Sequence, residues 1–122
     1  MTDAYFFDSY ALIEILEGNP AYAPYTSAGL FTTKLNLFEV YYALLRKGRA
    51  EEAEAFIEKY YPYVIDFDAY ALRTAAAFRA KHHGRKLSMT DCIGYTLANI
   101  LGIPFLTGDR EFHDAPNVAF VK

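Results

Sequence analysis

The chain lacks several features that would place it outside the cell or in a membrane. It has one cysteine, Cys92, among its 122 residues. A single cysteine cannot form an internal disulfide, so we expect a reducing compartment and a cytoplasmic protein. No apolar run approaches the roughly 18 residues that a membrane span needs. Asp3 and Asp8 interrupt "AYFF", the only apolar candidate near the start, so we expect neither a signal peptide nor a membrane anchor.

A strong charge of one sign is also missing. Lys and Arg number 12 and Asp and Glu 15, for a net charge of −3. This balance argues against a generic nucleic-acid-binding protein, which usually carries a basic surface. Apolar residues are abundant, because 53% of the chain is hydrophobic and 17% aromatic. We therefore expect residues 1–122 to form a single domain with a real core.

Short apolar runs alternate with helical patterns along the whole chain. Strands are expected at 4–7, 30–33, 63–67, 104–107 and 118–121. Helices are expected at 10–18, 34–47, 49–61, 69–84 and 88–102, with a loop at 20–29. This alternation favours an α/β fold, a three-layer α/β/α sandwich around a mainly parallel central sheet.

Acidic residues stand directly after two of the expected strands. Asp8 follows 4–7, and Asp109 follows 104–107. Ligands of open α/β sheets bind beyond the carboxyl ends of the strands. Asp91 and Glu39, early in their helices, can point at the same cleft. Four converging carboxylates repel one another, so the group is reasonable only around cations, and hard oxygen ligands suit Mg²⁺ or Mn²⁺.

Each acid also has an ordinary structural interpretation. Asp8 can cap the helix that follows it, and Asp91 completes the S-x-x-D pattern of a capping box. Glu39 can lie on a solvated helix face, and Asp109 can lie in a turn. The surrounding segments are strongly apolar, however, and in "LNLFEVYYALL" the polar positions are Asn36 and Glu39. This context favours a shared site.

The most specific motif of the chain is "LSMTDCIGYTLANILGIPFLTGDREF". It is preceded by "FFDSYALIEIL" and "LNLFEVYYALLRKG" and followed by "NVAFV". In this order the segments resemble the successive motifs of the PIN-domain family, most closely the small VapC-type toxin ribonucleases. The part from 50 to 87 matches only as generic helices, and Cys92 stands where alanine is more usual. The resemblance implies a PIN-like fold over nearly the whole chain.

The resemblance also implies a catalytic and metal-binding cluster. Residue by residue, the family's acids fall on Asp8, Glu39, Asp91 and Asp109. Asp8 and Asp91 would be the principal ligands of Mg²⁺ or Mn²⁺, while Glu39 and Asp109 would hold a second ion or orient its waters. The implied protein is a divalent-metal-dependent endoribonuclease, the toxin of a toxin–antitoxin pair, leaving 5′-phosphate and 3′-hydroxyl ends. Discounting the four acids changes the net charge from −3 to +1, so a metal-loaded site need not repel RNA.

Other polar residues are candidates for supporting roles. The hydroxyls of Ser9 and Thr107 are expected to orient the metal ligands. The most basic stretch, "RAKHHGRK" at 79–86, is either a helix C-terminus whose cations complement the helix dipole or a rim that binds RNA phosphates. The RNA-binding candidates are Arg79, Lys81, Arg85 and Lys86.

Aromatic residues occur on more than one face of the helical segments 35–45 and 53–61. One small core is not expected to hold Tyr41, Tyr42, Phe56, Tyr60 and Tyr61 together. Such side chains either stay half exposed with their hydroxyls in water or form a homodimer interface and a groove for an inhibitor segment. VapC-type toxins, which pair through helices and are silenced by an antitoxin, resemble the second arrangement.

Two other families place aspartates after strands, and both fit poorly. Haloacid-dehalogenase-type phosphatases need D-x-D where this chain has "DSY", and receiver domains need a late lysine where it has "FLTGD". The alternative that stays open is a non-catalytic PIN-like scaffold that binds RNA or protein. The four intact acids argue against it, since a degenerate site is expected to have lost one.

Overall fold

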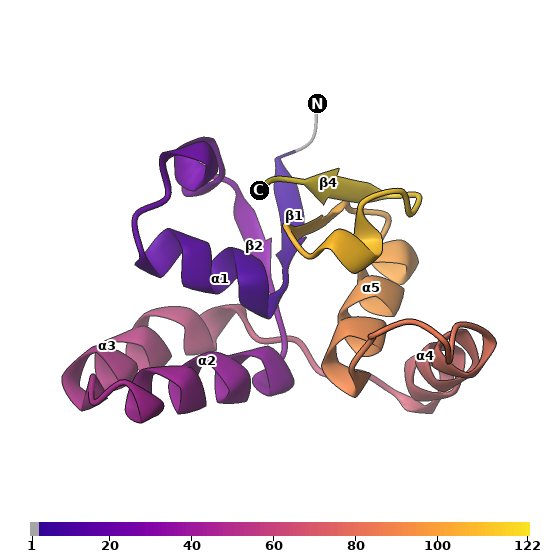
Figure 1. Ribbon diagram of the computed structural model, residues 1–122, viewed down its shortest axis with the longest axis horizontal. Helices are drawn as coiled ribbons and strands as arrows, with labels where there is room; N and C mark the ends of the chain where they lie inside the picture. Colours follow the sequence, from indigo (N-terminus) through magenta and orange to yellow (C-terminus); the bar gives the residue numbers. More distant parts are fainter. Residues whose placement is uncertain (1–2) are drawn as a thin grey trace.

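The computed structural model describes residues 3–122, and its centre is a parallel four-stranded sheet (Figure 1). The strands are β1 (Ala4–Phe7), β2 (Gly29–Phe31), β3 (Phe105–Thr107) and β4 (Val118–Phe120), in the order β2–β1–β3–β4. Phe6 pairs with Phe31 on one side and with Phe105 on the other, so β1 is central. The predicted parallel sheet is confirmed.

Helices cover both faces of this sheet (Figure 1). They are α1 (Ser9–Leu16), α2 (Lys34–Arg46), α3 (Ala50–Tyr60), α4 (Ala69–Lys81) and α5 (Met89–Leu101). Because side chains alternate along a strand, Phe7 and Leu106 pack with α1, α2 and α3, whereas Phe6 and Phe105 pack with α4 and α5. Two cores on opposite faces of one sheet make the predicted α/β/α sandwich. Within residues 3–122, no helix is both long and apolar enough to cross a membrane.

Helix α5 approaches the sheet closely at Gly94. A Cβ atom at Gly94 would lie 2.8 Å from Cε1 of Phe6 and 3.1 Å from Cε1 of Phe105, so only glycine allows this approach. The helix begins with the capping box of Ser88 and ends at Gly102, whose φ of 70° is left-handed. Since α5 returns the chain to the start of β3, its first turn lies at the edge where the strands end.

The prediction of a strand at 63–67 is wrong. The segment makes a single parallel bridge, between Thr32 and Val64, after the short 3₁₀ helix η2 (Tyr61–Tyr63). The backbone N–H of Thr32 donates to Tyr63, and its carbonyl accepts from Ile65. After Thr32 the chain passes through Thr33 into α2. The strand β2 therefore has no further residues that could pair with the segment 65–67 and extend the sheet.

The predicted loop at 20–29 contains a 3₁₀ helix, η1 (Pro20–Tyr25). Its Tyr22 is buried and donates from its hydroxyl to the carbonyl of Val121 at 2.5 Å, which ties the segment to the C-terminal end of the chain. The other predicted helices and strands agree with the structure to within three residues at each end.

Candidate active site

Three aspartates lie at the carboxyl edge of the sheet, each at the start of a helix. Asp8 follows β1 and caps α1, accepting at 2.8 Å from the backbone N–H three residues on. Asp109 follows β3 and begins the 3₁₀ helix η3 (Arg110–Phe112), accepting at 3.0 Å from the N–H two residues on. Asp91 lies in the first turn of α5 and accepts from the N–H of Ser88 at 2.9 Å. The capping interpretations are therefore correct, and the caps also fix the three carboxylates in place.

The acids influence one another electrostatically. Asp8 is only 3% exposed. Burial raises its pKa to about 7, with Asp91 and Asp109 adding to the rise and hydrogen bonds from Thr107 and the Ala11 backbone opposing it. Burial also raises the pKa of Asp91, and the charges of Asp109 and Glu39 raise it further. The structure thus brings all four predicted acids into one electrostatic cluster.

A chain of side-chain hydrogen bonds between α1 and α2 holds Glu39 beside Ser9, the residue that follows Asp8. Ser9 donates from Oγ to Oε1 of Glu39 at 2.6 Å, and Asn36 donates from Nδ2 to Oγ of Ser9 at 3.1 Å. Thr33 in turn donates from Oγ1 to Oδ1 of Asn36 at 2.6 Å. Asn36, 1% exposed, and Thr33 were not among the predicted site residues. The sequence feature that could have indicated Asn36 is its polar side chain inside the apolar helical run "LNLFEVYYALL".

Thr107 connects two of the acids. It is fully buried, its hydroxyl lies near enough to Asp8 to lower the pKa of that carboxyl, and it accepts from the backbone N–H of Asp109 at 3.0 Å. A Cβ atom at the intervening Gly108 would collide with the ring of Tyr10 and the carbonyl of Val121. Glycine is therefore required for the turn that brings Asp109 back to Asp8.

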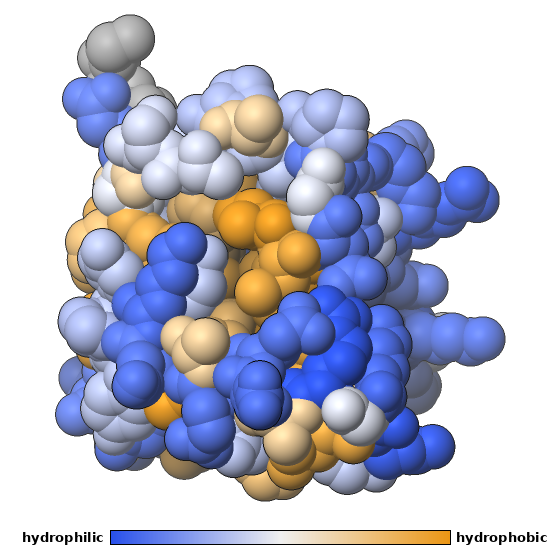
Figure 2. All heavy atoms as spheres, turned by 90° about the vertical axis from the view of Figure 1, so that its left-hand side faces the viewer, coloured by the Kyte–Doolittle hydropathy of each residue, from blue (hydrophilic) through white to orange (hydrophobic). Residues whose placement is uncertain are grey.

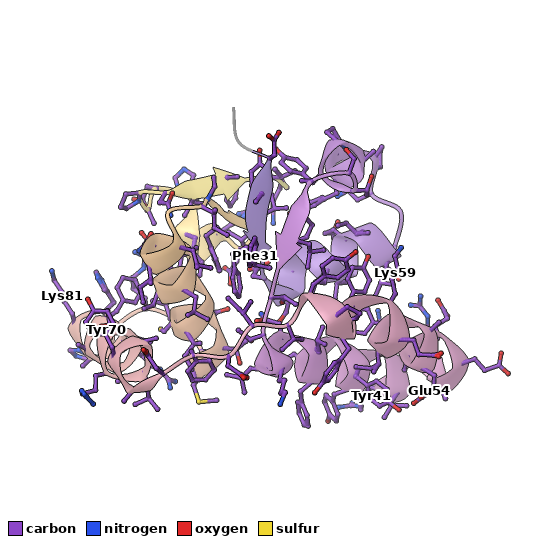
Figure 3. All side chains as sticks on the ribbon, turned by 180° about the vertical axis from the view of Figure 1, so that it is seen from behind. Phe31, Tyr41, Glu54, Lys59, Tyr70 and Lys81 are labelled. Carbon is purple, nitrogen blue, oxygen red and sulfur yellow. The ribbon has the colours of Figure 1, made fainter. Side chains whose placement is uncertain are left out.

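The four basic candidates lie in different surroundings. Arg85 is paired, with its Nε 3.2 Å from Oε1 of Glu111 and its Nη2 4.0 Å from Oδ1 of Asp114. Lys81 projects outward at the end of α4 (Figure 3). Arg79 lines an apolar pocket of about 390 Å³ beside α5, and Lys86 is exposed in the loop between α4 and α5. Their role in RNA binding stays a prediction.

The order of elements and the edge at which the acids gather agree with one family of proteins. A model of the PIN domain matches residues 5–118. The chain belongs to the PIN-domain family. This confirms the resemblance found in the sequence, and the matched range spans the positions of all four acids.

Solved structures have the same fold as this PIN domain. VapC20 from Mycobacterium tuberculosis, described as a sarcin–ricin loop cleaving toxin, has a TM-score of 0.76 and 18% identity, over 97% of this chain and 99% of that one. VapBC2 from Rickettsia felis, bound to a DNA fragment from its promoter, has a TM-score of 0.74 and 14% identity, over 98% of this chain and 99% of that one. At such identities the likeness establishes the fold. No curated protein matches the sequence.

The donor set of this PIN domain fits a hard divalent cation. An ionised carboxylate offers about four lone-pair sites. Asp8, Asp91 and Asp109 each accept a backbone N–H with one carboxylate oxygen, so each keeps lone pairs for a ligand. Within residues 3–122, no group of three or more His, Cys, Asp or Glu side chains is arranged to hold a metal ion. One or two carboxylates with retained waters is the usual coordination of Mg²⁺.

Proposed function

We propose that this PIN domain is a divalent-metal-dependent endoribonuclease and the toxin of a toxin–antitoxin pair. The observation that supports it is the group of four carboxylates at the carboxyl edge of the sheet: Asp8, Glu39, Asp91 and Asp109. Within residues 3–122, none of them forms an ion pair with a lysine or arginine. A buried negative charge without a cation is costly, and the raised pKa values of Asp8 and Asp91 reflect that cost. A bound cation would remove it.

The chain's own residues have distinct tasks in this proposal. Asp8 and Asp91 hold the principal Mg²⁺ or Mn²⁺, and Glu39 and Asp109 hold a second ion or orient its waters. Thr107 keeps Asp8 and Asp109 in register, while Ser9 orients Glu39. When bound, the metal supplies an activated water and neutralises charge on the phosphodiester during in-line displacement. The expected products are a 5′-phosphate and a 3′-hydroxyl.

The partners follow from the same proposal. VapBC toxin–antitoxin proteins among the structural neighbours support an antitoxin partner. Phe56 and Tyr60 are buried, whereas Tyr42 and Tyr61 keep about half of their surface exposed. Apolar side chains also gather in the middle of the side of the molecule on which α1 and α3 lie (Figure 2). A homodimer and a cytoplasmic location stay predictions.

Substitution of Asp8 and Asp91 tests the nuclease proposal. Asp8→Asn and Asp91→Asn keep the side-chain shape and an oxygen for the cap but remove a metal-binding charge. We expect each to reduce cleavage of a single-stranded RNA in Mg²⁺ or Mn²⁺ by more than the about 10- to 100-fold that loss of an outer-shell partner costs. A chelator should abolish cleavage. The measurement is the initial rate by gel electrophoresis of end-labelled RNA.

Asp68→Asn is the matched control. Asp68 caps α4 through Ala71 as Asp8 caps α1, but it is exposed. Its substitution should leave the cleavage rate unchanged. Cleavage that survives in both Asp8→Asn and Asp91→Asn would refute the catalytic assignment. RNA binding by the wild type without cleavage in either metal would instead support the non-catalytic scaffold.

A further inference from the structure

The outward side of α2 carries four residues spaced four apart: Lys34, Phe38, Tyr42 and Arg46. All four are exposed, Phe38 to 70% and Tyr42 to 51%. Residues four apart lie above one another on an α-helix. The row therefore runs along the helix for about 18 Å, from one cation over two rings to a second cation. We call this row the α2 stripe.

The two rings of the α2 stripe already lie parallel. Their centroids are 6.4 Å apart and their planes differ by 7°. Arg46 donates from Nη1 to the Tyr42 hydroxyl at 3.1 Å, and its Cζ lies 5.8 Å from the centre of that ring. Two stacking contacts of about 3.5 Å each need about 7 Å, so a flat ring does not fit between Phe38 and Tyr42. It can stack on the outer face of Phe38.

The α2 stripe lies on the same helix as Glu39, one of the four acids. Glu39 follows Phe38 directly in the sequence and stands one helical turn before Tyr42. Glu39 is also the residue that Ser9 ties to the start of α1. A polymer bound along the α2 stripe would therefore pass within one helical turn of a carboxylate of the candidate active site.

The chemistry of the α2 stripe favours a single-stranded nucleic acid over a protein. Aromatic residues and arginine are also common in the cores of protein interfaces, but lysine is depleted there, and Lys34 stands one helical turn before Phe38. Cations combined with exposed aromatic rings are the common means of holding single strands, since the cations contact phosphates and the rings stack on bases. A duplex keeps its base faces covered and offers nothing to Phe38.

We propose that the α2 stripe is a binding site for single-stranded RNA, in which a base stacks on Phe38 and Lys34 and Arg46 contact the flanking phosphates. The inference rests on the proposed ribonuclease function and extends it. It predicts that the substrate has an unpaired segment and that this segment is bound next to Glu39.

RNA binding is measured without cleavage to test this site. A fluorescein-labelled 12-nucleotide RNA of mixed, unpaired sequence is titrated with the full chain in EDTA, and the Kd is read from fluorescence anisotropy. The Phe38→Ala/Tyr42→Ala double variant should raise Kd by about 5- to 150-fold, the range expected for loss of one stacked base. Phe38→Leu, which is apolar but not flat, should also weaken binding, whereas Phe38→Trp should preserve it.

Charge and placement have their own controls. Lys34→Gln and Arg46→Gln should each lower the salt dependence of binding, with the slope of log K against log salt falling by about 0.7 per lost phosphate contact. Tyr70→Ala removes an aromatic ring of similar exposure, 64%, on α4 at the opposite end of the molecule from Tyr41 of α2 (Figure 3). It should leave Kd unchanged.

The inference is overturned if the double variant binds RNA as well as the wild type does, or if Phe38→Leu binds as well as Phe38→Trp. It is also overturned if the double variant keeps its RNA affinity but changes in molar mass from dimer to monomer by light scattering. In that case the α2 stripe is a protein interface. Because binding is measured in EDTA, these outcomes are independent of cleavage, whose absence in the wild type would refute the ribonuclease proposal instead.

Discussion

The starts of α1 and α4 are built alike and placed differently. Asp8 accepts at 2.8 Å from the N–H of Ala11, and Asp68 accepts at 3.0 Å from the N–H of Ala71. Asp8 follows the central strand, and its burial, together with the charges of Asp91 and Asp109, raises its pKa, whereas Asp68 follows a coil and is exposed. The same local motif is a helix cap in both places. Only its position at the edge of the sheet makes one of them a candidate metal ligand.

The largest expected contrast between these two helix starts is in the pH dependence of stability. In the metal-free protein the pKa of Asp8 is about 7 in the folded state, against about 3.9 in an unfolded chain. Between these values the folded state binds more protons, so the free energy of unfolding falls as the pH rises. We expect a loss on the order of 4 kcal/mol from pH 4 to pH 8, measured by urea unfolding in EDTA.

Substitution at the two helix starts isolates the contribution of Asp8. Asp8→Asn should abolish most of the decline and should be more stable than the wild type at pH 8. Asp68→Asn should keep the wild-type decline, because Asp8 is still present. An equally steep decline in Asp8→Asn would mean that another group is responsible for it.

Metal binding is expected to separate the two helix starts by a smaller amount. Mn²⁺ at about 5 to 30 times a millimolar dissociation constant should raise the free energy of unfolding by about 1–2 kcal/mol. The gain should be larger at pH 8 than at pH 5, because Asp8 must release its proton before it coordinates a cation. The measurement is the urea midpoint with and without metal.

The controls for metal binding are the same pair of variants. Asp68→Asn should gain as much stability from Mn²⁺ as the wild type does, and Asp8→Asn should gain less. If both variants gain equally, Asp8 is not a ligand, and the ion binds elsewhere on the chain.

The sequence could predict where Asp8, Asp91 and Asp109 lie in the fold, because the position of each depends on local patterns. A short apolar run before Asp8 or Asp109 indicates a buried strand, and alternation with helices makes the strands parallel. The edge on which the acids gather follows from those two facts. Asp91 needed only the capping pattern and the helix direction, since a helix that returns the chain to a parallel strand starts where the strands end.

What could not be predicted depends on how elements rotate and pair. Residues 63–67 pair with only one residue of the chain that follows β2, because that chain soon enters α2. The sequence of 63–67 itself does not contain this information. The contact of Asn36 with Ser9 depends on how α2 is turned against α1. The spacing of the α2 stripe can be seen in the sequence. That the stripe is exposed can be inferred only from the structure, in which Val40 and Leu44 on the other side of α2 are buried.

The smallest expected difference concerns the cap itself. Asp68→Ala removes the side-chain oxygen that accepts from Ala71 and should cost about 1 kcal/mol of stability, the usual value of an N-cap. Because Asp68 is exposed and apart from the acidic cluster, this cost should be similar in EDTA and in Mn²⁺. Asp68→Asn keeps an acceptor and should cost less. The values come from urea unfolding at a single pH.

Asp8→Ala loses the same kind of cap, but it also removes a buried carboxyl group whose unfavourable contribution to folding grows as the pH rises from about 3.9 to its raised pKa of about 7. Its cost should therefore be about the cap alone below pH 4, and it should become a gain at pH 8 in EDTA. In Mn²⁺ the gain should shrink, since the wild type is then stabilised by the ion that the variant binds less well. If Asp8→Ala and Asp68→Ala lose equal stability at every pH, both aspartates are caps and nothing more.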